Sequence, residues 1–489
     1  MISRRVLLSG ALAAAALPAL ADGPASSIRP ERRPTRGQGI SAGPAAGALI
    51  AAANLGGAVG FVVADAATGA VLEAVEPDLG LPPASTAKAL TSLFALERLG
   101  PGHRFATSLI ATGPVSGGRL QGDLVLAGSG DPTLDTDDLG DLAAQLAAAG
   151  VRSVAGRFLV WDRALPAIDQ IAADQPDHVG YNPAISGLNL NYNRVHFEWK
   201  RAGGNWGVAM DARGERFVPP VRMARMTVVE RDQPLFTYLR RDAQEDWTVA
   251  STALGQGGSR WLPVRRPGLY AGEVFQTLAR AQGIDLPAAS QVGVLPKGRV
   301  LAQRHSDTLP DMLREMLRFS TNLTAEVLGL TASRSDRLAA SAAQMSGWTK
   351  DRFGAAGRLV DHSGLGGASR ISAADMVRAL VASQATTTGQ LLPGLLRDFG
   401  MRDADGREVA SPIRVMAKTG TLNFVSALVG HIVPPAGRPL VFAIFCADAQ
   451  RRDRLAEAER EQPPGGKAWT SRARKLQGQL VARWAGAYC

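Results

Sequence analysis

The chain has 489 residues, of which 46% are apolar and 20% are charged. This composition is ordinary for a globular protein, and the length is sufficient for about two to four domains. The formal net charge of +10 favours contact with an anionic polymer. The charge is spread along the chain without the aromatic-basic motifs of nucleic-acid-binding modules, which argues against nucleic acid as a partner.

The first 21 residues have the pattern of a signal peptide. Arg4 and Arg5 precede a short, Ala-rich apolar run that ends in an Ala-x-Ala sequence at 19–21, which is typical of a cleavage site. The run is short for a transmembrane helix, which disfavours the alternative of a retained anchor. Paired arginines also occur in twin-arginine signals, so the export route stays open. We expect a mature periplasmic protein.

Residues 22–45 are rich in Pro, Arg, Gly and Ser and lack hydrophobic periodicity. This pattern predicts a disordered linker. A Gly-x-Ser-x-Gly sequence at 39–43 matches the nucleophile motif of α/β-hydrolases, which needs a strand before it and a helix after it. Because this sequence lies in the predicted linker, we discard it.

Ordered structure is expected from about residue 46. Apolar runs at 59–65 and 71–75 predict a β-hairpin, and a helix is predicted at 85–99 between Pro and Gly residues. Short strand-like runs broken by Gly, Pro and Asp then predict a mostly-β insertion over 106–275. Further periodic segments are predicted helices at 139–149, 270–282, 309–319, 323–330, 372–383 and 471–484, and predicted strands at 414–421, 427–433 and 440–446.

Helices in the middle of the chain, flanked by strands near both ends, predict one sheet built from the N- and C-terminal parts. The fold class is therefore α/β (α+β) and multidomain. The expected organisation is a signal peptide at 1–21, a linker at 22–45, the first part of the sheet domain at 46–105, the insertion at 106–275 and the second part of the sheet domain at 276–489.

Ser85 and Lys88 form the single Ser-x-x-Lys sequence of a chain with seven lysines. A serine hydroxyl is a weak nucleophile until a base accepts its proton. Residues three apart share a helix face, so Lys88 reaches Ser85 if the predicted helix begins there. Lys88 can be a base at neutral pH only if burial and a nearby positive charge, for which Lys418 is the candidate, lower its pKa. We therefore predict Ser85 as nucleophile and Lys88 as general base.

A second motif, Ser320-Thr321-Asn322, lies between two predicted helices. A short loop at this point can direct both polar side chains into a cleft. We expect Ser320 to relay a proton to the leaving group, and Asn322 to hydrogen-bond Lys88 and a substrate amide.

The third motif, Lys418-Thr419-Gly420-Thr421, is predicted to be an edge strand. Lys418 and the threonines would hold a substrate carboxylate by charge-assisted hydrogen bonds. Gly420 leaves room for the substrate backbone, and the N–H groups of Ser85 and Thr421 would form an oxyanion hole. Each motif alone is also compatible with a helix start, a loop or a bulged strand. The three in this order predict acyl transfer by serine and lysine.

The ordered set Ser-x-x-Lys, Ser-x-Asn and Lys-Thr-Gly resembles that of the penicillin-recognising serine enzymes. Local segments are similar to the D-alanyl-D-alanine carboxypeptidase/endopeptidase family, the class C low-molecular-mass penicillin-binding proteins of the penicillin-binding protein 4 type. The resemblance covers nearly all of residues 50–489. The segments that carry it lie at 128–133, 181–189, 361–365 and 418–422.

The resemblance implies a transpeptidase/β-lactamase-like domain with extra domains inserted between the first two motifs. It implies a serine DD-peptidase that releases terminal D-Ala from peptidoglycan stem peptides or cuts D-Ala–diaminopimelate cross-links. The reaction would pass through an acyl-enzyme on Ser85, and β-lactam antibiotics would acylate the same residue. The resemblance implies no metal and no cofactor.

The chain departs from the family sequence Asp-Gly-Ser-Gly-Leu-Ser-Arg, whose Arg helps to hold the stem-peptide side chain. His362 replaces the first Gly, and Gly366 and Gly367 replace Ser and Arg. Arg370 is the nearest arginine, either as a substitute or as a residue that only leads into a helix. Asp162 matches an inserted-domain acid of the same subsite. The resemblance therefore implies that Asp162 contacts the substrate side chain, and Arg370 is the candidate to replace the missing arginine.

Two other functions stay open. A β-lactamase or esterase could use the same site, although the long insertion between Ser85 and Ser320 argues against it. A catalytically silent peptidoglycan-binding protein could keep the fold, although the intact Lys88, Asn322 and Lys418 argue against it. The sequence does not give the oligomeric state.

The cysteines and histidines point to no additional chemistry. Cys446 lies in an apolar run and is expected to be a buried, inert thiol, with a disulfide to Cys489 as the alternative. The six histidines form no zinc-binding sequence pattern, so no metal site is predicted.

Overall fold

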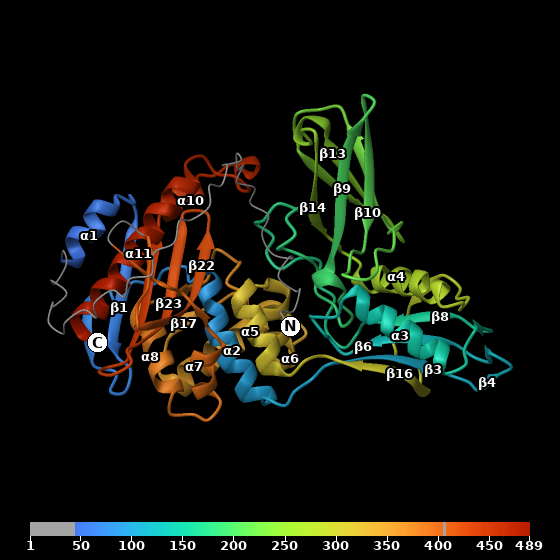
Figure 1. Ribbon diagram of the computed structural model, residues 1–489, viewed down its shortest axis with the longest axis horizontal. Helices are drawn as coiled ribbons and strands as arrows, with labels where there is room; N and C mark the ends of the chain where they lie inside the picture. The colour runs from blue at the N-terminus through green and yellow to red at the C-terminus, as the bar shows by residue number, and fades with distance from the viewer. Residues whose placement is uncertain (1–44, 404–406) are drawn as a thin grey trace, which may run out of the picture.

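The computed structural model describes residues 45–403 and 407–489. Two bodies lie side by side in Figure 1: a main domain of residues 46–105 and 306–489, and an insertion of residues 106–305. The predicted signal peptide and the predicted linker up to residue 44 lie outside the described residues. Within the described residues, the helices are all too short or too polar to cross a membrane.

Six antiparallel strands form the central sheet of the main domain, in the order β19-β22-β23-β24-β1-β2. The pairing of β1 with β24 joins the two ends of the chain, as the sequence predicted. The strands are β1 (Ala58–Asp65), β2 (Val71–Val75), β19 (Arg397–Asp398), β22 (Arg414–Leu422), β23 (Val425–Val433) and β24 (Leu440–Ala447).

Helices cover both faces of this sheet. Val62 and Ala443 face a core with the larger helical layer, whereas Phe61 and Ile444 face a second core beneath α1 (Ala46–Ala53) and α11 (Gly466–Tyr488). Because both faces are buried, β23 and β24 are apolar almost throughout. The larger layer consists of α2 (Ala87–Leu99), α5 (Leu309–Phe319), α6 (Asn322–Ser333), α7 (Leu338–Phe353), α8 (Ala373–Ser383) and α9 (Leu392–Leu395).

The insertion contains a five-stranded mixed sheet in the order β15-β8-β6-β3-β16. Two helices, α3 (Thr136–Ala148) and α4 (Pro267–Ala281), share its apolar core. The strands are β3 (Ala106–Ala111), β6 (Leu124–Gly128), β8 (Phe158–Trp161), β15 (Ala289–Gln291) and β16 (Arg299–His305).

The insertion also contains a small sheet of β4 (Val115–Ser116), β5 (Arg119–Leu120) and β7 (Ser153–Val154). Two further three-stranded sheets stand above α4 in Figure 1. They contain most of the strands that the sequence analysis did not predict. Their orders are β10-β9-β14 and β11-β13-β12. The strands are β9 (Arg194–Ala202), β10 (Asn205–Asp211), β11 (Ala224–Val229), β12 (Phe236–Arg240), β13 (Glu245–Ala250) and β14 (Gly257–Pro263).

The insertion ends later than the expected boundary at residue 275. β15 pairs with β8, and β16 pairs with β3 over its whole length, so the sheet of the insertion continues to His305. The periodicity of a segment predicts a strand but does not say which sheet the strand joins. The corrected boundary therefore comes from the pairing.

Both cysteine thiols are free. Cys446 is fully buried in the core beneath α11, as predicted, and burial raises the pKa of its thiol to about 12. A thiol in this state is unreactive at neutral pH.

The two-sided burial of the sheet predicts a large contrast between two valines on paired strands. Val63 on β1 is 0% exposed, whereas Val71 on β2 is 61% exposed. We expect Val63→Ala to lower the free energy of unfolding by about 2 kcal/mol because it removes buried methyl groups. The matched Val71→Ala variant should change it by less than about 0.5 kcal/mol. Urea denaturation of both variants measures the difference, and equal midpoints would contradict it.

Candidate active site

Ser85 lies in a tight turn immediately before α2. The turn is a 3-10 segment, Ala84–Thr86, and Ala84 has a left-handed φ of 47°. A Cβ atom on residue 364 would lie 1.8 Å from the Ala84 carbonyl oxygen, so only Gly364 allows the neighbouring loop to approach this turn. The close approach fixes the position of the serine at the start of the helix.

The Lys88 ammonium group is completely buried and donates three hydrogen bonds. Its Nζ lies 3.0 Å from Ser85 Oγ, 2.7 Å from Asn322 Oδ1 and 2.8 Å from the Ser363 carbonyl oxygen. Burial lowers the pKa of Lys88 to about 7, against the opposing effect of Glu326 and Asp361. Lys88 is therefore a base within reach of the serine hydroxyl, as predicted.

Two buried carboxyl groups hold the loop behind Lys88. Glu326 on α6 accepts hydrogen bonds from the N–H groups of His362 and Ser363, at 2.9 and 2.8 Å. Asp361 accepts one from the N–H group of Gly364 at 2.7 Å. Burial raises the pKa of Glu326 to about 8 and also raises that of Asp361. These bonds direct the Ser363 carbonyl oxygen towards Lys88.

Lys418 forms a second buried cationic centre. Its Nζ donates to Ser320 Oγ at 2.9 Å and to the Thr419 carbonyl oxygen at 2.8 Å. Ser320 ends α5 with a left-handed φ of 59°, which turns its side chain out of the helix. Burial, and then the charge of Lys88, hold the pKa of Lys418 well below its usual range. The sequence analysis predicted that burial and the charge of Lys418 would lower the pKa of Lys88. Burial does lower it, but the charges that act on Lys88 are those of Glu326 and Asp361, which raise it.

Asn322 connects the reaction centre to the insertion. Its Oδ1 accepts from Lys88, and its Nδ2 donates to the Tyr181 carbonyl oxygen at 2.9 Å. The neighbouring Asn182 is buried and accepts from the N–H groups of Ile171 and Ala172, which braces the loop that carries Tyr181. The sequence analysis missed Tyr181 because its backbone oxygen makes the contact.

Strand β22 lies directly against the serine turn. A Cβ atom on residue 420 would lie 2.8 Å from the Pro83 carbonyl oxygen and 3.0 Å from the Ser85 nitrogen, so Gly420 permits the contact. β19 pairs with β22 at residues 416 and 417, and in the described chain this pairing does not continue into the exposed threonines Thr419 and Thr421. The edge beside Ser85 is therefore open to an extended peptide.

Two predicted substrate-binding residues make their hydrogen bonds with residues outside this centre. Asp162 lies in a cavity of about 90 Å³ within the insertion, where its Oδ2 accepts from Gln291 Nε2 at 2.8 Å. Arg370 donates to the carbonyl oxygens of Gly367 and Ser369 at 2.6 and 2.8 Å. Their contact with a substrate side chain stays a prediction.

The departures from the family sequence have a steric explanation. A Cβ atom on residue 329 would lie 2.2 Å from the His362 ring, so Gly329 leaves room for this ring. The His362 Nε2 atom lies 2.6 Å from Ser341 Oγ. Burial lowers the pKa of His362 to about 3, so the ring is neutral at neutral pH.

A Cβ atom on Gly367 would lie 2.5 Å from Arg452 Nη2, on α10 (Ala449–Asp453). The sequence analysis missed Arg452, whose guanidinium group covers the glycine.

The five predicted catalytic residues thus form two hydrogen-bonded groups, Ser85–Lys88–Asn322 and Ser320–Lys418. The two groups are close enough for the charge of Lys88 to act on Lys418. Together they combine a nucleophile, a lysine with a pKa near neutrality and a second cation beside an open strand edge. This arrangement defines the class of serine acyl-transfer enzymes that use lysine as the base.

Comparison with known proteins identifies the family within that class. The model of the D-Ala-D-Ala carboxypeptidase 3 (S13) family matches residues 46–463. The chain is 29% identical over 490 residues to a D-alanyl-D-alanine carboxypeptidase of Actinomadura sp. (strain R39), covering 89% of this chain and 88% of that one. It is 23% identical over 389 residues to the D-alanyl-D-alanine carboxypeptidase DacB of Haemophilus influenzae, covering 74% and 79%.

Solved structures show the same fold. Penicillin binding protein 4 from H. influenzae superposes with a TM-score of 0.72 at 20% identity, covering 90% of this chain and 99% of that one. A complex of that protein with a β-lactam superposes with a TM-score of 0.69 at 20% identity, covering 89% and 98%. The predicted transpeptidase/β-lactamase-like fold with a β-rich insertion is confirmed.

The chain belongs to the D-Ala-D-Ala carboxypeptidase 3 (S13) family of peptidases. It is a serine-type carboxypeptidase, as the sequence motifs predicted.

The contact between β22 and the serine turn predicts a catalytic defect without unfolding. A methyl group at Gly420 would push the strand away from Ser85. We expect Gly420→Ala to lower kcat/KM for D-Ala release by about a hundredfold, the cost of a displacement near 1 Å. Gly207→Ala on β10 is the control, because its Cβ would meet nothing closer than 3.7 Å. Equal activity of the two variants, with unchanged melting temperatures, would contradict the steric argument.

Proposed function

We propose that this protein is a DD-peptidase acting on peptidoglycan stem peptides, with both carboxypeptidase and endopeptidase activity. One observation carries the proposal: Lys88 Nζ lies 3.0 Å from Ser85 Oγ and has a pKa of about 7. The open edge of β22 supports an extended peptide substrate. The same acyl-enzyme serves both activities, since they differ only in the amine that leaves.

In the acylation step, neutral Lys88 accepts the proton of the Ser85 hydroxyl while Oγ attacks the carbonyl carbon of the penultimate D-Ala. The N–H groups of Ser85 and Thr421 stabilise the oxyanion. The amide C–N bond then breaks, and the proton that Lys88 accepted passes through Ser320 to the leaving amine, which leaves Lys88 neutral for the next step. Lys418 stabilises the substrate carboxylate at the edge strand, with Thr419 as its neighbour.

In the deacylation step, water attacks the ester carbonyl of the acyl-enzyme, and Lys88 again accepts a proton. The Ser85–acyl bond breaks, and the serine recovers its proton. The hydrogen bond from Lys88 to Asn322 Oδ1 keeps the amine in position through both steps.

Penicillin binding belongs to the same proposal. A β-lactam is an acylating amide, and the relative with the same fold has been solved with a β-lactam bound. The alternative of a β-lactamase or esterase uses the same nucleophile. The alternative of a catalytically silent peptidoglycan-binding protein requires no nucleophile. We further propose export to the periplasm, which the N-terminal sequence pattern supports.

The pKa of Lys88 predicts the pH dependence of the reaction. Only the neutral amine accepts a proton, and its fraction rises as the pH rises through about 7. We expect kcat/KM for D-Ala release to rise about tenfold per pH unit below 7 and to level off above pH 8. Lys88→Arg should abolish activity, whereas Lys350→Arg on the exposed side of α7 should retain it. A rate that keeps rising to pH 10 would contradict the assignment.

Covalent labelling tests the nucleophile. We expect fluorescent penicillin to give a stable band with the wild type and none with Ser85→Ala, because the label is an ester of Ser85 Oγ. Ser116→Ala, which removes an exposed serine in the insertion, should label like the wild type. An unlabelled wild type with intact drug would support the silent protein, and one with consumed drug would support the β-lactamase. Release of D-Ala from a pentapeptide and cleavage of a cross-linked dimer then measure the two peptidase activities separately.

A further inference from the structure

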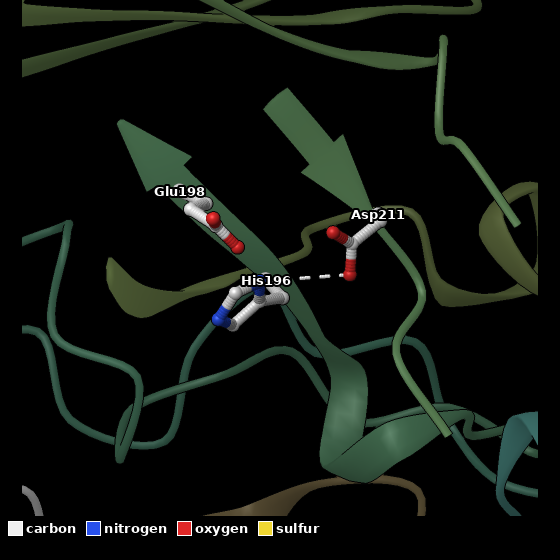
Figure 2. Close-up of side chains that lie close together, drawn as sticks. All are labelled: His196, Glu198 and Asp211. Carbon is white, nitrogen blue, oxygen red and sulfur yellow. Dashed lines mark ion pairs between the residues drawn. The ribbon is translucent and has the colours of Figure 1, made fainter. Parts of the chain in front are cut away.

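Three side chains of types that can ligate a metal lie close together on β9 and β10 of the insertion (Figure 2). His196 and Glu198 are two residues apart on β9 and therefore lie on the same face of the strand. Asp211 on β10 lies directly opposite His196 in the strand register. Ligand atoms of the three side chains all lie within 4.8 Å of one another.

The imidazole supplies an independent observation. His196 is 6% exposed, and its Nδ1 makes no hydrogen bond. This nitrogen lies 3.5 Å from Asp211 Oδ1, which is longer than an ordinary N–H···O hydrogen bond. Buried polar atoms are rarely left without a partner. The nitrogen thus has Asp211 as an ion-pair partner but no hydrogen bond, and a cation shared by the two groups would satisfy both.

We propose that His196, Glu198 and Asp211 bind a divalent transition-metal cation of the zinc class. One imidazole nitrogen and two carboxylates are a ligand set that suits Zn²⁺, and a water molecule can complete the tetrahedron. The two carboxylates balance the charge of the cation. Because the ligands come from paired strands, the cation would cross-link β9 and β10 at the base of the small sheets.

Arg213 competes with the cation for the same carboxylates. Its Nη2 donates to Glu198 Oε2 at 3.0 Å and to Asp211 Oδ2 at 2.9 Å. The guanidinium group thus supplies positive charge to both acids. Its side chain is 41% exposed, so it can move into solvent when a cation replaces it. This competition distinguishes a metal site from an ordinary ion-pair cluster, because the two predict opposite changes in cation affinity for a variant without Arg213.

Calorimetric titration of the untagged, chelator-treated full chain with Zn²⁺ tests the proposal. We expect one saturable site per chain in the wild type. Glu198→Gln, an exposed change that spares the core, should weaken binding at least about tenfold, since even outer-shell partners of metal ligands have effects of this size. Arg213→Ala should strengthen binding about fivefold because it removes the competing cation. Glu230→Gln, which changes an exposed acid of the insertion, should bind Zn²⁺ with the affinity of the wild type.

Several results would overturn the proposal. These are the absence of saturable Zn²⁺ binding, equal affinity of the Glu198→Gln and Glu230→Gln variants, and weaker binding after Arg213→Ala. X-ray absorption at the zinc edge gives a readout of the ligands themselves. A first shell of nitrogen and oxygen donors is expected, together with outer-shell scattering from the ring atoms of one imidazole, and the absence of imidazole scattering would exclude His196.

Discussion

The buried amine of Lys88 is the interaction on which the rest of the active site depends. Transfer of an ammonium group out of water costs several kcal/mol, and the protein replaces the lost water with three oxygen acceptors. Those acceptors come from the serine turn, from α6 and from the loop at 361–367. A single group therefore fixes the relative positions of three chain segments that are distant in the sequence.

The surrounding packing maintains this dry environment. Gly364 and Gly420 each allow backbone to lie against the serine turn at distances that a Cβ atom would prevent. Glu326 and Asp361 partly offset the positive charge but are themselves buried and bound to backbone N–H groups. The pKa of Lys88 is set by the balance between burial and these two acids. Small residues and buried acids thus contribute to the chemistry without contacting a substrate.

The sequence was sufficient to predict the catalytic residues but not the residues that surround them. Ser85 and Lys88 could be paired because helix geometry relates residues three apart, and Ser320 because an open loop follows its helix. Spatial neighbours from other elements carry no such local signal. The Tyr181 contact uses a backbone oxygen and Arg452 comes from a distant short helix, so neither could be found from spacing.

Strand register explains the remaining differences between prediction and structure. The end of the insertion depends on which sheet β15 and β16 join, and periodicity does not encode that choice. The approach of Asp211 to His196 likewise depends on the pairing of β9 with β10. The core strands of the main domain were predictable because burial on both faces leaves long apolar runs in β23 and β24.

The pairing of β1 with β24 has a consequence for the order of folding. The insertion is one continuous stretch of chain and can close its own core while the rest of the protein is still being made. The main domain cannot close its core at that stage, because β1 pairs with β24, which is synthesised near the end of the chain. Closing the long loop between these two strands is slow. Lys418 reaches Ser320 only when that sheet has formed. The active site is therefore complete only after the C-terminal strands have joined the sheet, and a chain that ends before them carries a serine without a complete active site.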